Sequence, residues 1–113
     1  MPTENNGRMI HEKVSEGYER TITWLENLMV VVCEFTKGPA SSPEPPHSHP
    51  HEQITYVAEG ELIFFKAGKD LHLSKGDLIT IPSGVPHCIQ TLTGYVRLID
   101  TFSPIRKDFL PEK

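Results

Sequence analysis

PHSHPHEQITYV, residues 46–57, is the stretch of this sequence that decides its fold and its chemistry. In an extended chain, side chains two residues apart point to the same face. His47, His49 and Gln53 share this parity, so two imidazole rings and an amide oxygen can face one way. Imidazole nitrogens and side-chain oxygens are ligands that divalent metals accept. The stretch therefore predicts half of a metal site.

The missing ligand has to come from another part of the chain. The best candidate is His87, at the end of IPSGVPH, residues 81–87. Our central hypothesis is a divalent metal held by the side chains of His47, His49, Gln53 and His87 inside a small β-barrel. The alternative for the paired histidines is a polar surface turn, and the alternative for Gln53 is a hydrogen bond to a substrate.

A third histidine, His51, has the same parity and could take the place of Gln53. Pro50 interrupts the regular strand just before it, so we expect His51 at the mouth of the barrel instead. We expect Glu52, of opposite parity, to face solvent. His72 lies in a short predicted strand, and we expect a structural or exposed histidine there.

The bulk composition limits the classes of protein that this chain can be. Its 113 residues are enough for one domain with a modest core. A net charge of −4 argues against nucleic acid or an anionic membrane as the main partner. No apolar run is long enough to span a membrane, and the polar start lacks a signal core. We therefore expect a cytoplasmic protein with Cys33 and Cys88 reduced and buried, although a disulfide between them stays open.

Short apolar segments separated by turn residues predict an all-β fold, a sandwich or a barrel. The turn signal Glu59-Gly60 predicts that residues 51–58 and 61–66 form a hairpin. We expect an arm or edge strand over residues 1–16, the barrel over 17–103, and a tail or closing flap over 104–113. The expected strands are residues 20–24, 28–35, 51–58, 61–66, 71–73, 78–81, 87–90 and 95–102.

Residues 28–35, LMVVVCEF, are apolar on both faces of the predicted strand. Such a strand is covered on both sides in a folded protein. One face would line the barrel, and the other would meet a second sheet or another subunit. We therefore expect a homodimer.

At its histidine motifs the chain resembles a cupin. The first cupin motif has the form G-x5-H-x-H-x3/4-E-x6-G, and it matches here from His47 to Gly60. The second, G-x5-P-x-G-x2-H-x3-N, matches from Gly76 to His87. Two departures are the glutamine at 53, where a glutamate is usual, and the absence of the final asparagine. The resemblance implies a single-domain double-stranded β-helix, the cupin jelly-roll barrel.

Two segments narrow the resemblance to the KdgF-type pectin-degradation cupins: HSHPHEQITY, residues 47–56, and DTFSPIRKDFL, residues 100–110. The resemblance implies that Asp100, Phe102 and Arg106 line the pocket. It also implies the substrate, a small anionic sugar, and the reaction, the linearisation of 4,5-unsaturated uronate monosaccharides from pectin or alginate breakdown.

The residues themselves agree with this chemistry. Four neutral ligands leave a divalent ion its full charge, which favours Lewis-acid work by Ni, Zn, Fe, Co or Mn. Asp100 shares a strand face with apolar residues, which raises a carboxyl pKa and suits proton transfer. Arg106 can hold a carboxylate through its planar fork. Each of these residues also has an alternative role without function in catalysis or binding: Asp100 would cap a turn, Arg106 would be a solvated charge of the tail, and Phe102 would fill the core.

Two other functions remain open at this point. A non-catalytic cupin would bind a small sugar or acid without converting it. A metal-dependent dioxygenase would consume oxygen with a phenolic or enediol substrate, although the glutamine ligand argues mildly against it.

Overall fold

The computed structural model describes residues 7–111 and confirms the all-β prediction. The first six residues of the expected arm and the last two of the expected tail lie outside the described residues. The strands are β1 (Met9–Ser15), β2 (Tyr18–Trp24), β3 (Met29–Phe35), β4 (Glu52–Glu59), β5 (Glu61–Lys66), β6 (Lys69–Ser74), β7 (Leu78–Ile81), β8 (His87–Thr91) and β9 (Val96–Ser103).

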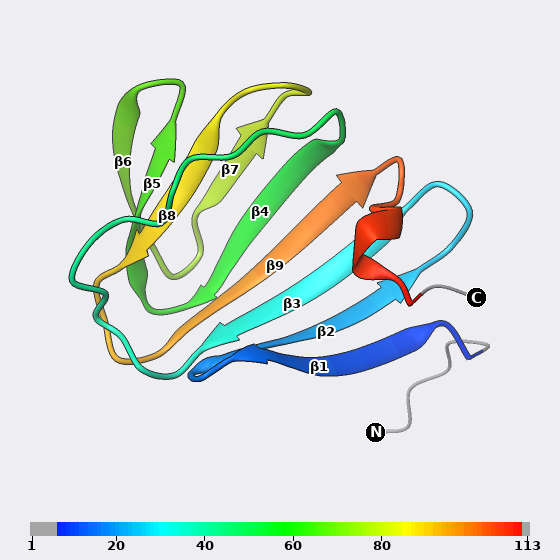
Figure 1. The fold of residues 1–113 in the computed structure, drawn as a ribbon. Coiled ribbons are helices and arrows are strands. Elements are labelled where there is room, and N and C mark those ends of the chain that lie inside the picture. Colours follow the sequence, from blue (N-terminus) through cyan, green and yellow to red (C-terminus); the bar gives the residue numbers. More distant parts are fainter. Residues whose placement is uncertain (1–6, 112–113) are drawn as a thin grey trace.

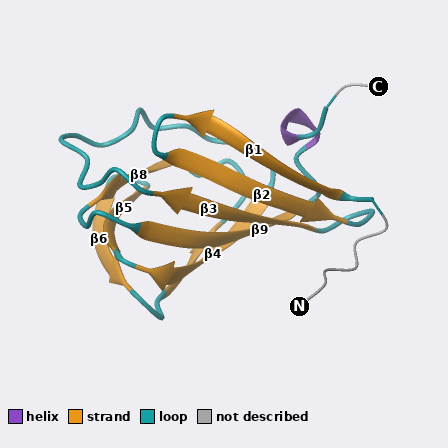
Figure 2. Ribbon diagram, turned by 90° about the horizontal axis from the view of Figure 1, so that it is seen from below, coloured by secondary structure: helices purple, strands orange, loops and turns teal. Residues whose placement is uncertain are grey.

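The strands form two antiparallel sheets that face each other (Figures 1 and 2). The larger sheet has six strands in the order β1-β2-β3-β9-β4-β7, and the smaller has three in the order β6-β5-β8. Because β3 neighbours β9, and β9 neighbours β4, distant parts of the chain lie side by side at the centre of the larger sheet. The core fills the space between the sheets.

Strict alternation of side chains explains how the larger sheet presents one face to the core. In β4, Gln53, Thr55 and Val57 are buried, whereas the residues between them are exposed. The neighbouring β9 buries Leu98 and Phe102 on the same inner face, with Asp100 half-buried between them. Polar residues of both strands therefore enter the barrel beside apolar ones, which is the first sign of a functional interior.

The predicted hairpin of residues 51–58 and 61–66 is wrong. These segments are β4 and β5, and they belong to different sheets: β4 pairs with β7 and β9, and β5 pairs with β6 and β8. The link between them passes the carbonyl oxygen of Tyr95, which lies 2.2 Å from where a Cβ on Gly60 would stand. Gly60 also has a φ of +86°. This turn therefore carries the chain from one sheet to the other.

The two ends of the described chain both pack on the barrel. β1 is an edge strand of the larger sheet, paired only with β2 among the described strands. After β9, Lys107–Phe109 form a single 3-10 turn, and Phe109 packs against the core. Cys33 and Cys88 are both buried and free, so they form no disulfide with each other. Residues 7–111 contain no helix that is long and apolar enough to cross a membrane.

Candidate metal centre and cavity

The structure brings the three motif histidines together at one end of the barrel. His47 and His49 lie in the loop before β4, and His87 is the first residue of β8. A backbone bridge joins the two segments: the His47 N–H donates to the His87 carbonyl at 3.0 Å, and the His87 N–H donates back at 2.9 Å. The ring of His87 lies 4.4 Å from that of His47 and 4.9 Å from that of His49, between centroids.

The hydrogen bonds of these rings leave nitrogen lone pairs for a metal. A carbonyl oxygen only accepts, so the His87 Nδ1 that lies 2.9 Å from the Val85 carbonyl carries its ring proton. Its Nε2 is buried and has no hydrogen-bond partner within the described residues. In the same way, the His49 Nδ1 donates to the carbonyl of His51 at 3.0 Å, which frees its Nε2. Backbone partners of this kind orient metal-binding histidines.

Other observations agree with a metal at this point. The candidate ligand atoms of the three histidines lie within 4.8 Å of one another. The ring of His47 also makes a hydrogen bond to the backbone of Pro45. Burial lowers the pKa of His87 to about 4, so this imidazole is neutral near pH 7, as metal ligation requires. The three histidines therefore fit a divalent metal.

Gln53 stands where a fourth ligand is needed. Its amide nitrogen donates to the Thr55 hydroxyl at 2.9 Å, which turns its oxygen toward the His49 Nε2, 3.1 Å away. Because His49 carries its proton on Nδ1, the His49 Nε2 and the Gln53 side-chain oxygen are both acceptors. A cation bound to both would satisfy the pair, so the amide oxygen is placed to serve as a ligand.

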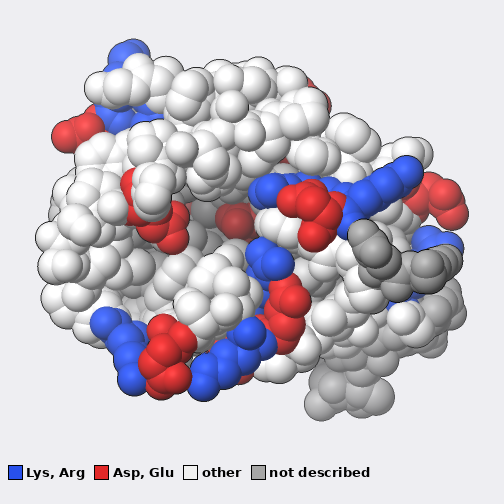
Figure 3. Space-filling view, viewed as in Figure 1, with Lys and Arg blue, Asp and Glu red and all other residues white. Residues whose placement is uncertain are grey.

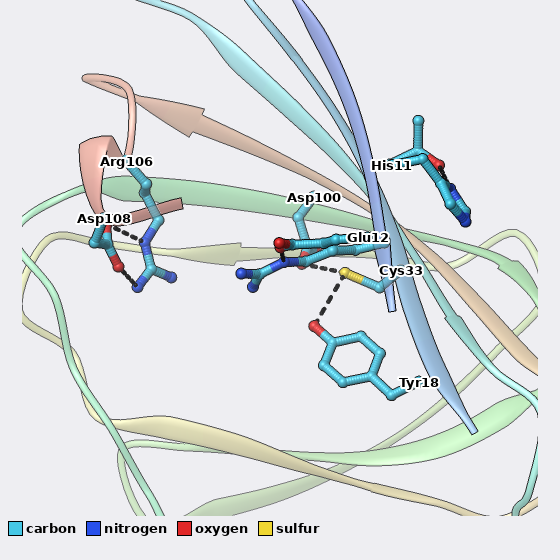
Figure 4. Close-up of polar contacts among 9 residues, drawn as sticks. His11, Glu12, Tyr18, Cys33, Asp100, Arg106 and Asp108 are labelled. Atoms are coloured by element: carbon cyan, nitrogen blue, oxygen red, sulfur yellow. Dashed lines mark hydrogen bonds and ion pairs between the residues drawn. The ribbon is translucent and has the colours of Figure 1, made fainter. Parts of the chain in front are cut away.

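A chain of hydrogen bonds leads from Gln53 to Asp100. The Thr55 hydroxyl, which is fully buried, donates to the Asp100 Oδ1 at 2.7 Å. The Cys33 thiol reaches the other carboxylate oxygen at 3.5 Å, and the Tyr18 hydroxyl reaches the Cys33 sulfur at 3.8 Å (Figure 4). Burial raises the pKa of Asp100, against the opposing effect of these donors. This carboxyl group therefore holds a proton more readily than an exposed one.

Asp100 and the metal centre face a cavity of about 480 Å³, a size that suits a monosaccharide. Figure 3 shows the hollow, with an acidic side chain at its floor and basic side chains beside it. Phe102 is buried in the wall, its ring centroid 5.7 Å from that of His49. The guanidinium carbon of Arg106 lies 4.0 Å from the ring centroid of Phe109, and its Nη2 is 2.9 Å from Asp108 Oδ2.

All seven predicted site residues thus lie at one end of the barrel. Six of them line the cavity: His47, Gln53, His87, Asp100, Phe102 and Arg106. The seventh, His49, meets the cavity wall through its contacts with Gln53 and Phe102. Outside the set, His51 is half-buried beside His49, at 5.5 Å between ring centroids, whereas Glu52 and His72 are exposed.

Sequence reasoning missed several residues that also line the cavity. Tyr18 and Arg20 enter from β2, Cys33 from β3, Glu44 from the proline-rich loop between β3 and β4 (residues 36–51) and Phe109 from the terminal turn. Arg20 forms an ion pair with Glu12 of β1, and its guanidinium carbon lies 4.0 Å from the centroid of Phe109. The shared parity of Tyr18 and Arg20 was visible in the sequence, but nothing there showed that this face lines a cavity.

Comparisons with known proteins identify relatives over nearly the whole chain. A family model described as "Cupin domain" matches residues 31–102. The pectin degradation protein KdgF of Dickeya dadantii is 39% identical over 101 residues, 88% of this chain and 89% of that protein.

Two solved structures are similar in fold and in sequence. The structure of KdgF from Halomonas sp. has a TM-score of 0.80 and 33% identity, and it covers 93% of this chain and 94% of its own. An RmlC-like cupin from Shewanella frigidimarina has a TM-score of 0.80 and 34% identity. The match covers 93% of this chain and 92% of that chain.

Proposed function

The chain belongs to the cupin family, and we propose that it is a metal-dependent enzyme that linearises 4,5-unsaturated uronate monosaccharides. The observation that carries this proposal is the joint placement of two features in one cavity. One is the histidine cluster with a buried, unpartnered His87 nitrogen, and the other is the carboxyl group of Asp100. The similarity to KdgF, a protein named for pectin degradation, supports the substrate class.

In this proposal His47, His49, Gln53 and His87 hold one divalent transition metal, which is Ni, Zn, Fe, Co or Mn. When bound, the metal polarises substrate oxygens as a Lewis acid without changing its oxidation state. The His49 and His87 rings are held by backbone carbonyls and Gln53 is held by Thr55, so the ligands are arranged before the metal arrives.

The other predicted site residues bind and orient the sugar. Arg106 holds the uronate carboxylate through its guanidinium, which stacking on Phe109 keeps in place. Phe102 forms an apolar wall beside the sugar ring. These contacts would place the ring with its hydroxyl end toward the histidines.

Asp100 moves a proton in this scheme. Ring opening removes the proton of the anomeric hydroxyl, breaks the bond from the anomeric carbon to the ring oxygen, and adds a proton to the carbon at position 4. The electrons of the O–H bond form the C=O bond of the new aldehyde. The electrons of the bond between the anomeric carbon and the ring oxygen form the C=O bond of the ketone. The electrons of the C=C bond form the new C–H bond at position 4. No oxidant, reductant or second substrate is needed.

The decisive experiment follows the absorbance of the C=C chromophore when purified protein is added to unsaturated galacturonate. We expect loss of the chromophore well above the spontaneous rate, and loss of this activity after chelation. Binding of the sugar without conversion would overturn the enzyme proposal in favour of a binding protein. A protein that leaves unsaturated galacturonate unchanged but consumes oxygen with a phenolic or enediol substrate would instead be a dioxygenase.

We further propose that the chain forms a homodimer through the outer face of its larger sheet. Neighbouring strands place Tyr56 opposite Leu78 and Ile99 on this face, and Ile54 lies on the same side of β4. Ile54, Tyr56 and Leu78 are 49%, 38% and 65% exposed, and a continuous apolar surface of this kind favours association. Light scattering should give twice the chain mass, and Leu78→Lys should give the monomer mass. A monomeric wild-type protein would contradict this assignment.

A further inference from the structure

The proposed reaction needs two proton transfers at different places on the sugar ring. One proton leaves the anomeric hydroxyl, and another reaches the carbon at position 4, across the ring. A single carboxyl group fixed in one wall of the cavity cannot lie beside both positions at once. The reaction therefore calls for a second group that can carry a proton. Among the described residues that line the cavity, the acidic ones are Asp100 and Glu44.

Glu44 is held in place by the strand that carries His87. The backbone N–H of Glu44 donates to the carbonyl of Ile89 in β8 at 3.0 Å. The side-chain carboxylate of Glu44 accepts a hydrogen bond from the backbone of Ile89. Its neighbours Pro43 and Pro45 restrict the backbone on both sides. The loop is also bridged to β8 at His47, so the backbone of Glu44 is fixed relative to the histidine cluster.

The two carboxyl groups come from opposite walls. Asp100 belongs to β9 in the larger sheet, whereas Glu44 lies along β8, an edge strand of the smaller sheet. Loss of solvent around the carboxyl group raises the pKa of Glu44, and the charge of Asp100 raises it further. Both carboxyl groups line the same cavity, and an ionised Asp100 favours a protonated Glu44.

We propose that Glu44 is a second catalytic residue, the acid that delivers a proton to the carbon at position 4 while Asp100 accepts the proton of the anomeric hydroxyl. This inference rests on the proposed function. The pair of electrons in the C=C bond forms the new C–H bond with the proton of Glu44, and the ring oxygen becomes the ketone oxygen. Exchange of protons with water then resets Glu44 to the acid and Asp100 to the carboxylate.

Glu44 also has a structural contact, the hydrogen bond to the backbone of Ile89, and the test has to separate the two roles. Glu44→Gln keeps a side-chain oxygen that can accept this hydrogen bond but cannot deliver a proton. Glu44→Ala removes both. Asp70→Asn is the matched control, because Asp70 is exposed in β6, does not line the cavity, and the substitution changes the net charge equally.

The measurements are kcat, KM and the thermal midpoint with unsaturated galacturonate as substrate. We expect Glu44→Gln to keep the wild-type midpoint and KM while kcat falls about 100-fold, the usual contribution of a general acid. Glu44→Ala should lose kcat to the same extent and also lower the midpoint. If glutamine restores both the midpoint and kcat, Glu44 is only structural and the inference is overturned. A wild-type protein without turnover would instead refute the proposed function itself.

Discussion

Replacing Thr55 by valine tests whether the metal centre and Asp100 form one connected unit. The Thr55 hydroxyl is fully buried, accepts from the Gln53 amide at 2.9 Å and donates to Asp100 at 2.7 Å. Valine has nearly the same shape, so the substitution removes the two hydrogen bonds without opening a large cavity. The Gln53 amide then loses its partner, and the oxygen that faces His49 is no longer held in place.

The expected loss of stability follows from these contacts. A buried donor or acceptor without a partner costs about 1–3 kcal/mol, and Gln53 and Asp100 each lose one. Because Asp100 is only half-buried, water can replace part of the hydrogen bonding that it loses. We therefore expect the free energy of unfolding to fall by about 2 kcal/mol. For a domain of 113 residues that corresponds to a fall of about 8 °C in the thermal midpoint. Metal affinity should fall about 10–100-fold, as for other groups that orient a ligand.

The assay is urea unfolding of the metal-free protein, with metal affinity measured separately by calorimetric titration. The matched control is Thr55→Ser, which keeps the hydroxyl and removes a buried methyl group. It should cost about 1 kcal/mol and leave metal affinity unchanged. If valine and serine lower metal affinity equally, the hydroxyl does not position Gln53 and our description of the connected unit is incorrect.

Three further predictions follow from the site. Asp100→Asn should keep the fold and the metal but reduce kcat about 10²–10⁴-fold in the chromophore assay; wild-type turnover would exclude proton transfer by Asp100. Arg106→Lys keeps the charge but loses the planar fork, so KM should rise about tenfold, and an unchanged KM would place the substrate carboxylate elsewhere. Burial raises the pKa of Asp100, so the folded metal-free chain binds a proton that the unfolded chain has released. Its stability to urea should therefore fall as the pH rises from the ordinary carboxyl pKa to the raised one. Asp100→Asn should make this slope smaller and leave the part that Glu44 contributes, whereas an unchanged slope would exclude Asp100 as its source.

The histidine cluster could be predicted because its signal is local. The spacing of His47 and His49 predicted that they face one way, and the second motif supplied His87. In the structure both lie in the loop before β4, with ring centroids 5.9 Å apart. The burial pattern of β4 and β9 was equally readable, since alternation of side chains is a property of every strand. The confirmed resemblance to cupins then indicated that the two motifs meet in one barrel.

Pairing between strands could not be predicted in the same way. Glu59-Gly60 has the composition of a hairpin turn, but Gly60 is required by the close approach of Tyr95, which comes from the far end of the sequence. The same limit applies to the cavity wall. Arg20 and Glu44 became candidates only when the fold placed β2 and the proline-rich loop around the same cavity as Asp100, because neither residue lies in a motif.

The most direct test of the account is a titration of Co²⁺ into the chelator-treated protein, followed by calorimetry and by the visible absorption of the bound ion. We predict one ion per chain with imidazole ligation, and a large loss of affinity in His87→Ala, because the Nε2 atom of His87 is buried and has no hydrogen-bond partner among the described residues. His72→Ala, which alters an exposed histidine paired with Glu61, should bind as the wild type does. Binding that is absent in the wild-type protein, or unchanged in His87→Ala, would contradict the metal centre.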